Sequence, residues 1–224
     1  MKTGLKALAV SPIGIVLLGV LVFLPAGTFN YWQGWVFIAV FTLATVIPTL
    51  YFARTNPATL QRRLHGGPIA EARTVQKFII IGAFSALFAM TAFSAYDHRV
   101  GWSKVPTAVC LIGDALVVAG LSIGMLVIEQ NNYAAATVRV EADQKLASRG
   151  LYKLVRHPMY AGNLILTLGI PLSLGSYWGL LFIIPGLLVL VFRILDEEKL
   201  LSQELAGYRE YKQRVHYRLV PYVW

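Results

Sequence analysis

The stretch "GLYKLVRHPMYAGN" (residues 150–163) marks a sharp change from a cationic segment to an apolar run. Arg156 and His157 stand directly before Pro158, and residues 158–174 carry no charge. Proline suits the first turn of a helix, where its missing N–H has no partner to lose. These residues therefore predict a helix that begins at Pro158, with His157 at its cap and Arg156 just outside it.

Five further apolar runs accompany this one, and the composition indicates what they face. Hydrophobic residues make up 57% of the 224-residue chain and charged residues only 14%. Few soluble folds bury so much apolar surface, so most of it is expected to face lipid. We predict an all-α, polytopic integral membrane protein with about six transmembrane helices, five being possible. The runs are residues 10–24, 35–52, 78–93, 106–128, 158–174 and 177–195.

The net charge of +9 is distributed very unevenly over the predicted loops. When the loops are assigned alternately to two sides, only Arg99 and Lys104 of the 20 Lys and Arg fall on one of them. The positive-inside rule makes this the outer side and puts both termini in the cytoplasm. The basic charge thus indicates a lipid bilayer as partner and excludes nucleic acid. The compact chain favours a prokaryotic plasma membrane.

The chain divides into two predicted parts. Residues 1–128 hold four apolar runs without a recognised motif, joined in part by a polar segment in which Leu60 and Leu64 suggest an amphipathic helix. His65, beside a break at residues 66–68, is interpreted as a solvated loop residue. Residues 129–224 are expected to hold the catalytic core: a helical hairpin, a cytoplasmic pocket and a C-terminal cytoplasmic helix. The single cysteine, Cys110, excludes a disulfide, and no metal site is predicted.

The last two apolar runs form a predicted helical hairpin that returns to the level where it began. The chain turns at residues 175–176, and both limbs are similar in length. Arg193 and the acidic residues 196–198 are therefore expected beside the cationic start of the first limb. A helix start favours anions because its N–H groups are free and its dipole is positive there. Cations on one helix and acidic groups on its neighbour predict a site for a zwitterionic ligand.

A purely structural interpretation is open at this point. Arg193 and Glu197 are four residues apart on a helix, a spacing at which they pair with each other. Arginine at a helix end commonly extends to the lipid headgroups. Tyrosines such as Tyr152 and Tyr160 are typical of the membrane interface.

Asp97 and His98 are adjacent in the sequence and could suggest an acid–base pair. They lie in a short loop predicted on the outer side, with no third partner, which disfavours such a pair.

Three sequence motifs of this chain, with their order and spacing, resemble those of the isoprenylcysteine carboxyl methyltransferase family. The superfamily of that family includes membrane phospholipid N-methyltransferases. The motifs are "GLYKLVRHPMY" at 150–160, "EEKLL" at 197–201 and "GYREYKQRVHYRLVP" at 207–221. The resemblance covers about residues 129–224. It departs from many relatives at "QKLA" (144–147), where the last residue is usually Val, a conservative change.

The resemblance implies a cytoplasmic site for S-adenosyl-L-methionine and methyl transfer to a lipophilic acceptor within the membrane. An isoprenylcysteine-type carboxylate is favoured as acceptor, with a phospholipid amine or a small thiol as alternatives. By the same resemblance Arg193 orients the acceptor carboxylate, and Arg156 and His157 are candidate catalytic residues. The implied cofactor contacts are Gln144, Lys145, Leu146, Ala147, Tyr152, His157, Pro158, Met159, Tyr160, Glu197 and Glu198.

Two other classes of protein compete with a methyltransferase. Membrane sterol-type reductases resemble this family in their C-terminal part but use NADPH, whose 2′-phosphate would need cations near Gln144. A transporter of small molecules would carry polar groups near the middle of the membrane. Asp114 is the one acidic residue inside an apolar run. The sequence therefore favours the methyltransferase.

Overall fold

The computed structural model describes residues 2–64, 74–131, 133 and 144–224. Within these residues the protein is all-helical, without a β-strand, which confirms the predicted fold class. His65 and the break at residues 66–68 lie outside this part of the chain. The elements are α1 (Lys2–Ala26), α2 (Trp32–Thr55), α3 (Pro57–Leu64), α4 (Thr74–Val100), α5 (Thr107–Gln130), η1 (Gly150–Lys153), α6 (Pro158–Ser173), η2 (Trp178–Phe182), α7 (Ile183–Glu204) and α8 (Tyr208–Arg214).

The first five apolar runs each correspond to one α-helix, and the sixth (177–195) covers η2 and the first part of α7. In the described part of the chain, four helices are long and apolar enough to cross a membrane: Trp32–Thr55, Thr74–Val100, Thr107–Gln130 and Trp178–Glu204. A shorter apolar segment, Pro12–Ala26, belongs to α1. Helix α6 has 16 residues, or about 24 Å, somewhat less than the roughly 30 Å of a hydrocarbon core. The protein is therefore an integral membrane protein in which α6 is a short limb.

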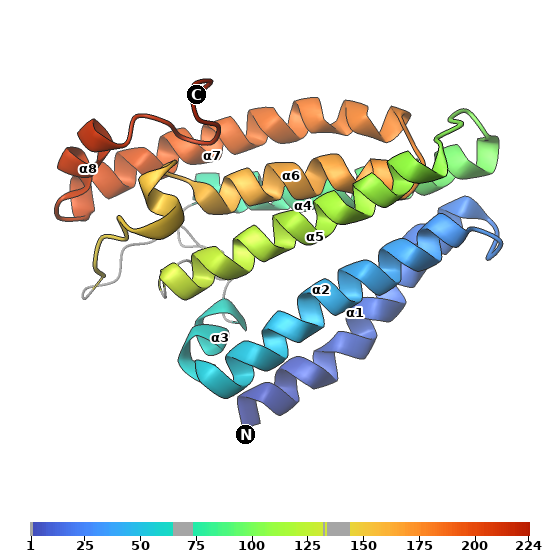
Figure 1. Ribbon diagram of the computed structural model, residues 1–224, viewed down its shortest axis with the longest axis horizontal. Coiled ribbons are helices and arrows are strands. Elements are labelled where there is room, and N and C mark those ends of the chain that lie inside the picture. Colours follow the sequence, from blue (N-terminus) through green and yellow to red (C-terminus); the bar gives the residue numbers. More distant parts are fainter. Residues whose placement is uncertain (1, 65–73, 132, 134–143) are drawn as a thin grey trace.

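The long helices lie lengthwise along one another, so that their connections gather at two ends (Figure 1). The α1–α2, α4–α5 and α6–η2 connections share one end, while α3, η1 and α8 lie toward the other. A Cβ atom on Gly27, after α1, would lie 3.3 Å from the Arg99 guanidinium, at the end of α4. Arg99 and Lys104 thus lie at the end predicted to be poor in cations. The orientation of this end relative to the cytoplasm stays a prediction.

A carboxylate holds the connections at this end together. Asp97 accepts hydrogen bonds from the Ser103 N–H (2.9 Å), the Ser103 hydroxyl (2.6 Å) and the Ser176 hydroxyl (2.5 Å). Its neighbour His98 instead stacks on Tyr31, with ring centroids 4.0 Å apart. Because the two side chains serve different partners, the structure supports the view that they are not an acid–base pair.

Glycines allow α5 and α6 to pack with their backbones in contact. A Cβ atom on Gly120 of α5 would lie 2.6 Å from the Gly162 carbonyl oxygen, and one on Gly169 of α6 would lie 2.7 Å from the Gly113 carbonyl oxygen. Small residues at helix contacts are the usual means of close approach in membranes. This packing fixes α6, and with it the motif at its start, against α5.

Helix α3 occupies the position of the predicted amphipathic segment. Its Leu60 is buried in a small cluster with Phe52 of α2 and Ile128 of α5. Met159, at the second position of α6, packs against the same cluster. The cluster therefore brings the end of α2 and α5 to the beginning of α6, where the candidate site lies.

Candidate functional site

The start of α6 is held in place by the C-terminal tail. Pro158 occupies the first helical position and His157 the cap, as the sequence predicts. The N–H groups of Arg156 and His157 donate to the carbonyl oxygens of Tyr217 and Arg218, each at 2.9 Å. Two backbone hydrogen bonds thus attach the motif loop to a segment about sixty residues later in the chain.

Glu198 of α7 is the centre of a buried ionic cluster. Its Oε1 atom accepts a hydrogen bond from the Arg156 Nε–H at 2.6 Å and lies 3.3 Å from His157 Nε2. Its Oε2 atom accepts one from Arg218 Nε–H at 3.2 Å. Only 4% of Glu198 and 7% of Arg156 are exposed. Removing one partner of such a buried pair typically costs about 3–5 kcal/mol, because the other charge is left uncompensated.

The guanidinium of Arg156 makes further contacts within the protein. Its Nη1 donates to the carbonyl oxygens of Val215 at 2.8 Å and His216 at 3.0 Å. Arg156 therefore connects α6, α7 and the tail, which supports a positioning role. The sequence prediction that Arg156 and His157 are catalytic, and that Glu198 contacts the cofactor, stays a prediction.

A second polar network lies one turn further into α6 and α7. Tyr160 donates a hydrogen bond to Glu197 Oε2 at 2.5 Å and accepts one from Arg193 Nε–H at 2.8 Å. Arg193 Nη1 donates to Gln76 Oε1 of α4 at 2.9 Å. The Gln76 amide in turn donates to Asp196. Residues of α4, α6 and α7 therefore form the network around the guanidinium that the family resemblance assigns to the acceptor.

The two networks meet at their aromatic members. The rings of His157 and Tyr160 stack with centroids 5.5 Å apart and planes 16° from parallel. The Arg193 guanidinium carbon lies 5.8 Å from the centre of the Tyr160 ring. The structure thus brings together the predicted residues His157, Tyr160, Arg193 and Glu197, which come from the motif at 150–160 and from α7.

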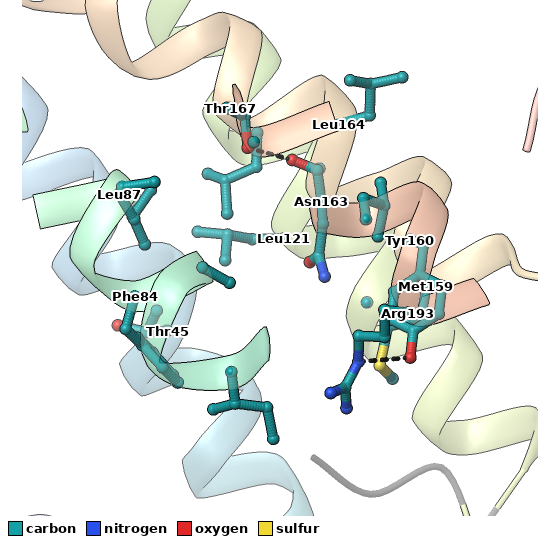
Figure 2. A pocket seen from close by; sticks show the side chains of 18 of the residues that line it. Thr45, Phe84, Leu87, Leu121, Met159, Tyr160, Asn163, Leu164, Thr167 and Arg193 are labelled. Atoms are coloured by element: carbon teal, nitrogen blue, oxygen red, sulfur yellow. Dashed lines mark hydrogen bonds between the residues drawn. The ribbon is translucent and has the colours of Figure 1, made fainter. Parts of the chain in front are cut away.

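An apolar cavity of about 540 Å³ lies beside Arg193 and Tyr160. It is bordered by α2, α4, α5, α6 and α7, with most of its wall made by Leu, Ile, Phe, Met and Ala side chains (Figure 2). Small-molecule sites commonly have volumes of roughly 300–1,000 Å³ and a few polar groups among apolar ones. Met159, predicted to contact the cofactor, lines this cavity. The cavity therefore combines an apolar wall with the cationic side chain of Arg193.

The remaining predicted cofactor residues precede α6. Residues 144–147 form neither helix nor strand, and the Leu146 side chain lies 3.6 Å from the position of a Cβ atom on Gly207. Lys145 is exposed, whereas Gln144, Leu146 and Ala147 are half-buried. The segment therefore lies beside the turn between α7 and α8. Residues 134–143, just before it, are outside the described part of the chain.

Tyr152 is anchored at both its backbone and its hydroxyl group. Its hydroxyl accepts a hydrogen bond from the Asn131 amide at 3.0 Å, and its carbonyl oxygen accepts one from the Tyr211 hydroxyl at 2.7 Å. Burial, with a contribution from the Glu197 charge, raises the pKa of Tyr152 to about 12. Tyr152 therefore stays a neutral hydrogen-bonding group at physiological pH.

Two polar residues of this region were missed by the sequence analysis. Gln76 is fully buried at the start of α4 and contacts Arg193. Asn163 lines the cavity from α6, three residues after Tyr160. Asn163 is an amide inside an uncharged apolar run, which is a signal in the sequence. Gln76 lies among polar loop residues, so nothing in the sequence distinguishes it.

Fold and site together define a helical membrane protein with a lipophilic cavity that ends in a charged, hydrogen-bonded network. Residues 109–206 match the profile of the phospholipid methyltransferase family. The predicted resemblance to integral membrane methyltransferases is therefore confirmed for this region, which is a little under half of the chain. It begins within α5, earlier than the motifs quoted from the sequence, and contains α6, α7, Arg193, Tyr160 and both acidic residues at 197 and 198.

The chain is also similar to the Delta(14)-sterol reductase TM7SF2 of the mouse. The two are 34% identical over 95 residues, which cover 39% of this chain and 22% of the reductase. The chain therefore spans only about a fifth of the length of this relative.

Proposed function

We propose that this protein is an S-adenosylmethionine-dependent membrane methyltransferase that methylates a carboxylate of a lipophilic acceptor. The observation that carries the proposal is the position of Arg193, whose guanidinium lines the apolar cavity and also contacts Tyr160. The family match supports methyl transfer as the reaction class. The apolar walls support a lipophilic acceptor, of which an isoprenylcysteine-type carboxylate is our first choice.

The chemistry of the cofactor fits three features that do not line the cavity: Glu197, Tyr152 and the segment 144–147. S-adenosylmethionine supplies an electrophilic methyl group on a sulfonium and carries an ammonium, a carboxylate and an adenosine. Glu197 offers a carboxylate suited to a cation, and its Oε2 is already oriented by Tyr160. Tyr152 and the segment 144–147 offer half-buried surface and neutral hydrogen-bonding groups. We assign the cofactor to these residues and the acceptor to the cavity.

In the proposed reaction the acceptor carboxylate attacks the methyl carbon in line with the sulfonium. A C–O bond forms, the C–S bond breaks and its electron pair stays on sulfur, giving a methyl ester and S-adenosylhomocysteine. No base is needed, because a carboxylate with an ordinary pKa of about 4 is ionised at neutral pH. Arg193 orients the carboxylate, and the apolar cavity excludes water from it.

Calorimetry with the purified protein and S-adenosylmethionine tests the cofactor, and absence of binding would overturn the proposal. The acceptor side is tested with Arg193→Ala, for which we expect retained cofactor binding and a loss of carboxylate methylation of at least about a hundredfold. Arg209→Ala is the matched control, because Arg209 is exposed on α8 and donates to the Ser202 carbonyl oxygen. Unchanged methylation by Arg193→Ala would remove the proposed role of Arg193.

A reductase is the second candidate, and the similarity to the mouse sterol reductase favours it. It requires NADPH, so the two functions differ in the cofactor they bind. Fluorescence of NADPH on titration with the protein tests this alternative. Saturable NADPH binding together with no binding of S-adenosylmethionine would replace our proposal by the reductase.

A further inference from the structure

The segment after α8 contains a tight turn that exposes four consecutive apolar residues, Val220, Pro221, Tyr222 and Val223, here called the tail tip. Tyr222 is 90% exposed and Val223 79%. The turn is held by its own backbone, since the N–H groups of Val223 and Trp224 donate to the Val220 carbonyl oxygen at 3.1 and 3.2 Å. The tail tip is therefore a defined apolar projection from the surface of the protein.

The backbone of the tail tip is strained in order to hold this projection. Tyr222 has a φ of 65°, and in the described part of the chain all other residues with a positive φ are glycines. The left-handed conformation is unfavourable for tyrosine, because its Cβ atom crowds the backbone. The Tyr222 ring lies 5.1 Å from the ring of Tyr217 and stays largely exposed, so contacts within the protein offset little of this strain. Strain at an exposed apolar turn indicates a partner outside the chain.

The tail lies at the level where α6 enters the membrane. Backbone N–H groups of Arg156 and His157, directly before the apolar α6, donate to carbonyl oxygens of the tail. Arg218 of the tail pairs with Glu198 of α7, and Leu195, one turn earlier on α7, is an exposed apolar residue. Figure 1 shows the C-terminal end beside α7, on the outside of the helices. These contacts place the tail tip at the boundary between lipid headgroups and hydrocarbon.

The charges around the tail tip match an anionic lipid surface. Between residues 205 and 224 the one acidic residue is Glu210, whereas the basic residues are Arg209, Lys212, Arg214 and Arg218. Arg214 is exposed and can reach headgroups beside the tip. Aromatic and apolar side chains flanked by cations are typical of segments that lie in the membrane interface.

We propose that the tail tip is an interfacial anchor, which inserts among the headgroups of an anionic lipid bilayer and thereby holds the tail against the start of α6. The tail supplies the backbone acceptors for Arg156 and His157, and it supplies the Arg218 side chain that pairs with Glu198. Release of the tip from the bilayer loosens these contacts together. The partner is the lipid surface itself, so this inference does not depend on the reaction that the protein catalyses.

Spin labels on the full chain in nanodiscs of phosphatidylcholine and phosphatidylglycerol test the location of the tip. A nitroxide at Val223→Cys is compared with one at Glu210→Cys on the exposed side of α8, while the native Cys110 is fully buried and takes no label. We expect membrane-soluble oxygen to relax the Val223 label several-fold more than an aqueous nickel chelate does, and the reverse for the Glu210 label. A Val223 label that behaves like the Glu210 label overturns the anchor. So does a label shielded from both reagents, as it would be beneath a protein partner or a second copy.

Hydrogen exchange tests the coupling to α6. The double variant Tyr222→Ser, Val223→Ser makes the tip polar and leaves the backbone contacts of the tail available. We expect the N–H groups of Arg156 and His157 to exchange about tenfold faster than in the native protein in the same nanodiscs. Tyr222→Phe is the matched control, because it keeps an aromatic ring at the interface, and it should leave the exchange unchanged.

The lipid dependence completes the test. In the native protein, nanodiscs of phosphatidylcholine alone should also speed the exchange of these two N–H groups, because the cations of the tail lose their anionic partners. Exchange that is the same in the double variant and the native protein overturns the coupling. Exchange that is the same in both lipid compositions overturns the role of anionic headgroups.

Discussion

The hydroxyl of Tyr160 on α6 donates to Glu197 on α7 at 2.5 Å and at the same time accepts a hydrogen bond from Arg193. This one hydroxyl group therefore lies between a carboxylate suited to the cofactor and a guanidinium that borders the acceptor cavity. Both groups belong to α7, and the Tyr160 hydroxyl of α6 orients both of them. The reacting groups of our proposal would meet at this point.

Replacing Tyr160 by Phe removes both hydrogen bonds and leaves the ring. We expect kcat to fall by about ten- to a hundredfold, because Arg193 and Glu197 lose their common partner. The stacking of the ring on His157 should keep the fold intact, so circular dichroism should be unchanged. Tyr222→Phe is the control, since Tyr222 is 90% exposed on the tail. Full activity of Tyr160→Phe would contradict the network.

Gln76 orients Arg193 without lining the cavity, so its replacement should act through the arginine. We expect Gln76→Leu to raise the acceptor KM about tenfold with little change in the affinity for S-adenosylmethionine. Gln76→Asn keeps an amide but is too short to reach, whereas Gln76→Glu keeps the reach and a group that accepts from Arg193. Partial rescue of KM by Gln76→Glu, but not by Gln76→Asn, is the expected signature. Equal values for all three variants would count against a positioning role.

The acceptor chemistry can be recognised from the pH dependence of methylation. A carboxylate acceptor, with an ordinary pKa of about 4, is already ionised at pH 6. The pKa of Tyr152 is raised to about 12 by burial, so this residue does not titrate below pH 9 either. We expect kcat/KM for a carboxylate acceptor to be flat within about twofold between pH 6 and 8.5. A tenfold rise per pH unit would instead indicate an amine or thiol that must first lose a proton.

Glu198 should matter for stability more than for chemistry, because it pairs with Arg156 and Arg218 in a buried site. Glu198→Ala leaves the buried Arg156 without a counter-charge. We expect a loss of about 3–5 kcal/mol in the free energy of unfolding, seen as a markedly lower unfolding temperature. Glu210→Ala is the matched control on the exposed face of α8 and should cost less than about 0.5 kcal/mol. An unfolding temperature unchanged by Glu198→Ala would show that the cluster is not structural.

The sequence predicted the parts of this site that depend on local patterns. The six apolar runs became helices and Pro158 begins α6. The motif residues His157 and Tyr160 meet Glu198 and Glu197, respectively, as expected from two limbs of similar length. The contacts of Arg156 with the tail were not predictable, because they are made to backbone carbonyl oxygens of a segment about sixty residues away in the chain. Gln76 escaped notice for the same reason: its role depends on how α4 lies against α7, which no spacing within one helix reveals.

Asp97 is a second residue whose partners could not be predicted from the sequence. Its sequence neighbour His98 drew attention to a possible acid–base pair, yet its partners are Ser103 and Ser176. The second of these lies 79 residues away in the chain. Polar residues in short connections are often used to join loops, and only the packing of the helices determines which loops meet.

The contact between α5 and α6 gives the sharpest test of the fold. A Cβ atom on Gly120 would lie 2.6 Å from the Gly162 carbonyl oxygen and 2.7 Å from the Leu166 nitrogen, both backbone atoms that cannot rotate away. Gly120→Ala should therefore force the helices apart and cost about 1–3 kcal/mol. Gly124→Ala, one turn later on the same helix, meets nothing within 4 Å.

The two glycines thus separate packing from helix propensity. Alanine is favoured over glycine inside a helix by about 1 kcal/mol, so Gly124→Ala should be neutral or stabilising. Gly120→Ala should instead lower the unfolding temperature, and it should also lower methylation because α6 carries Tyr160. The unfolding temperatures of both variants in lipid nanodiscs check this. A similar change in both would mean that α5 and α6 do not approach as closely as described.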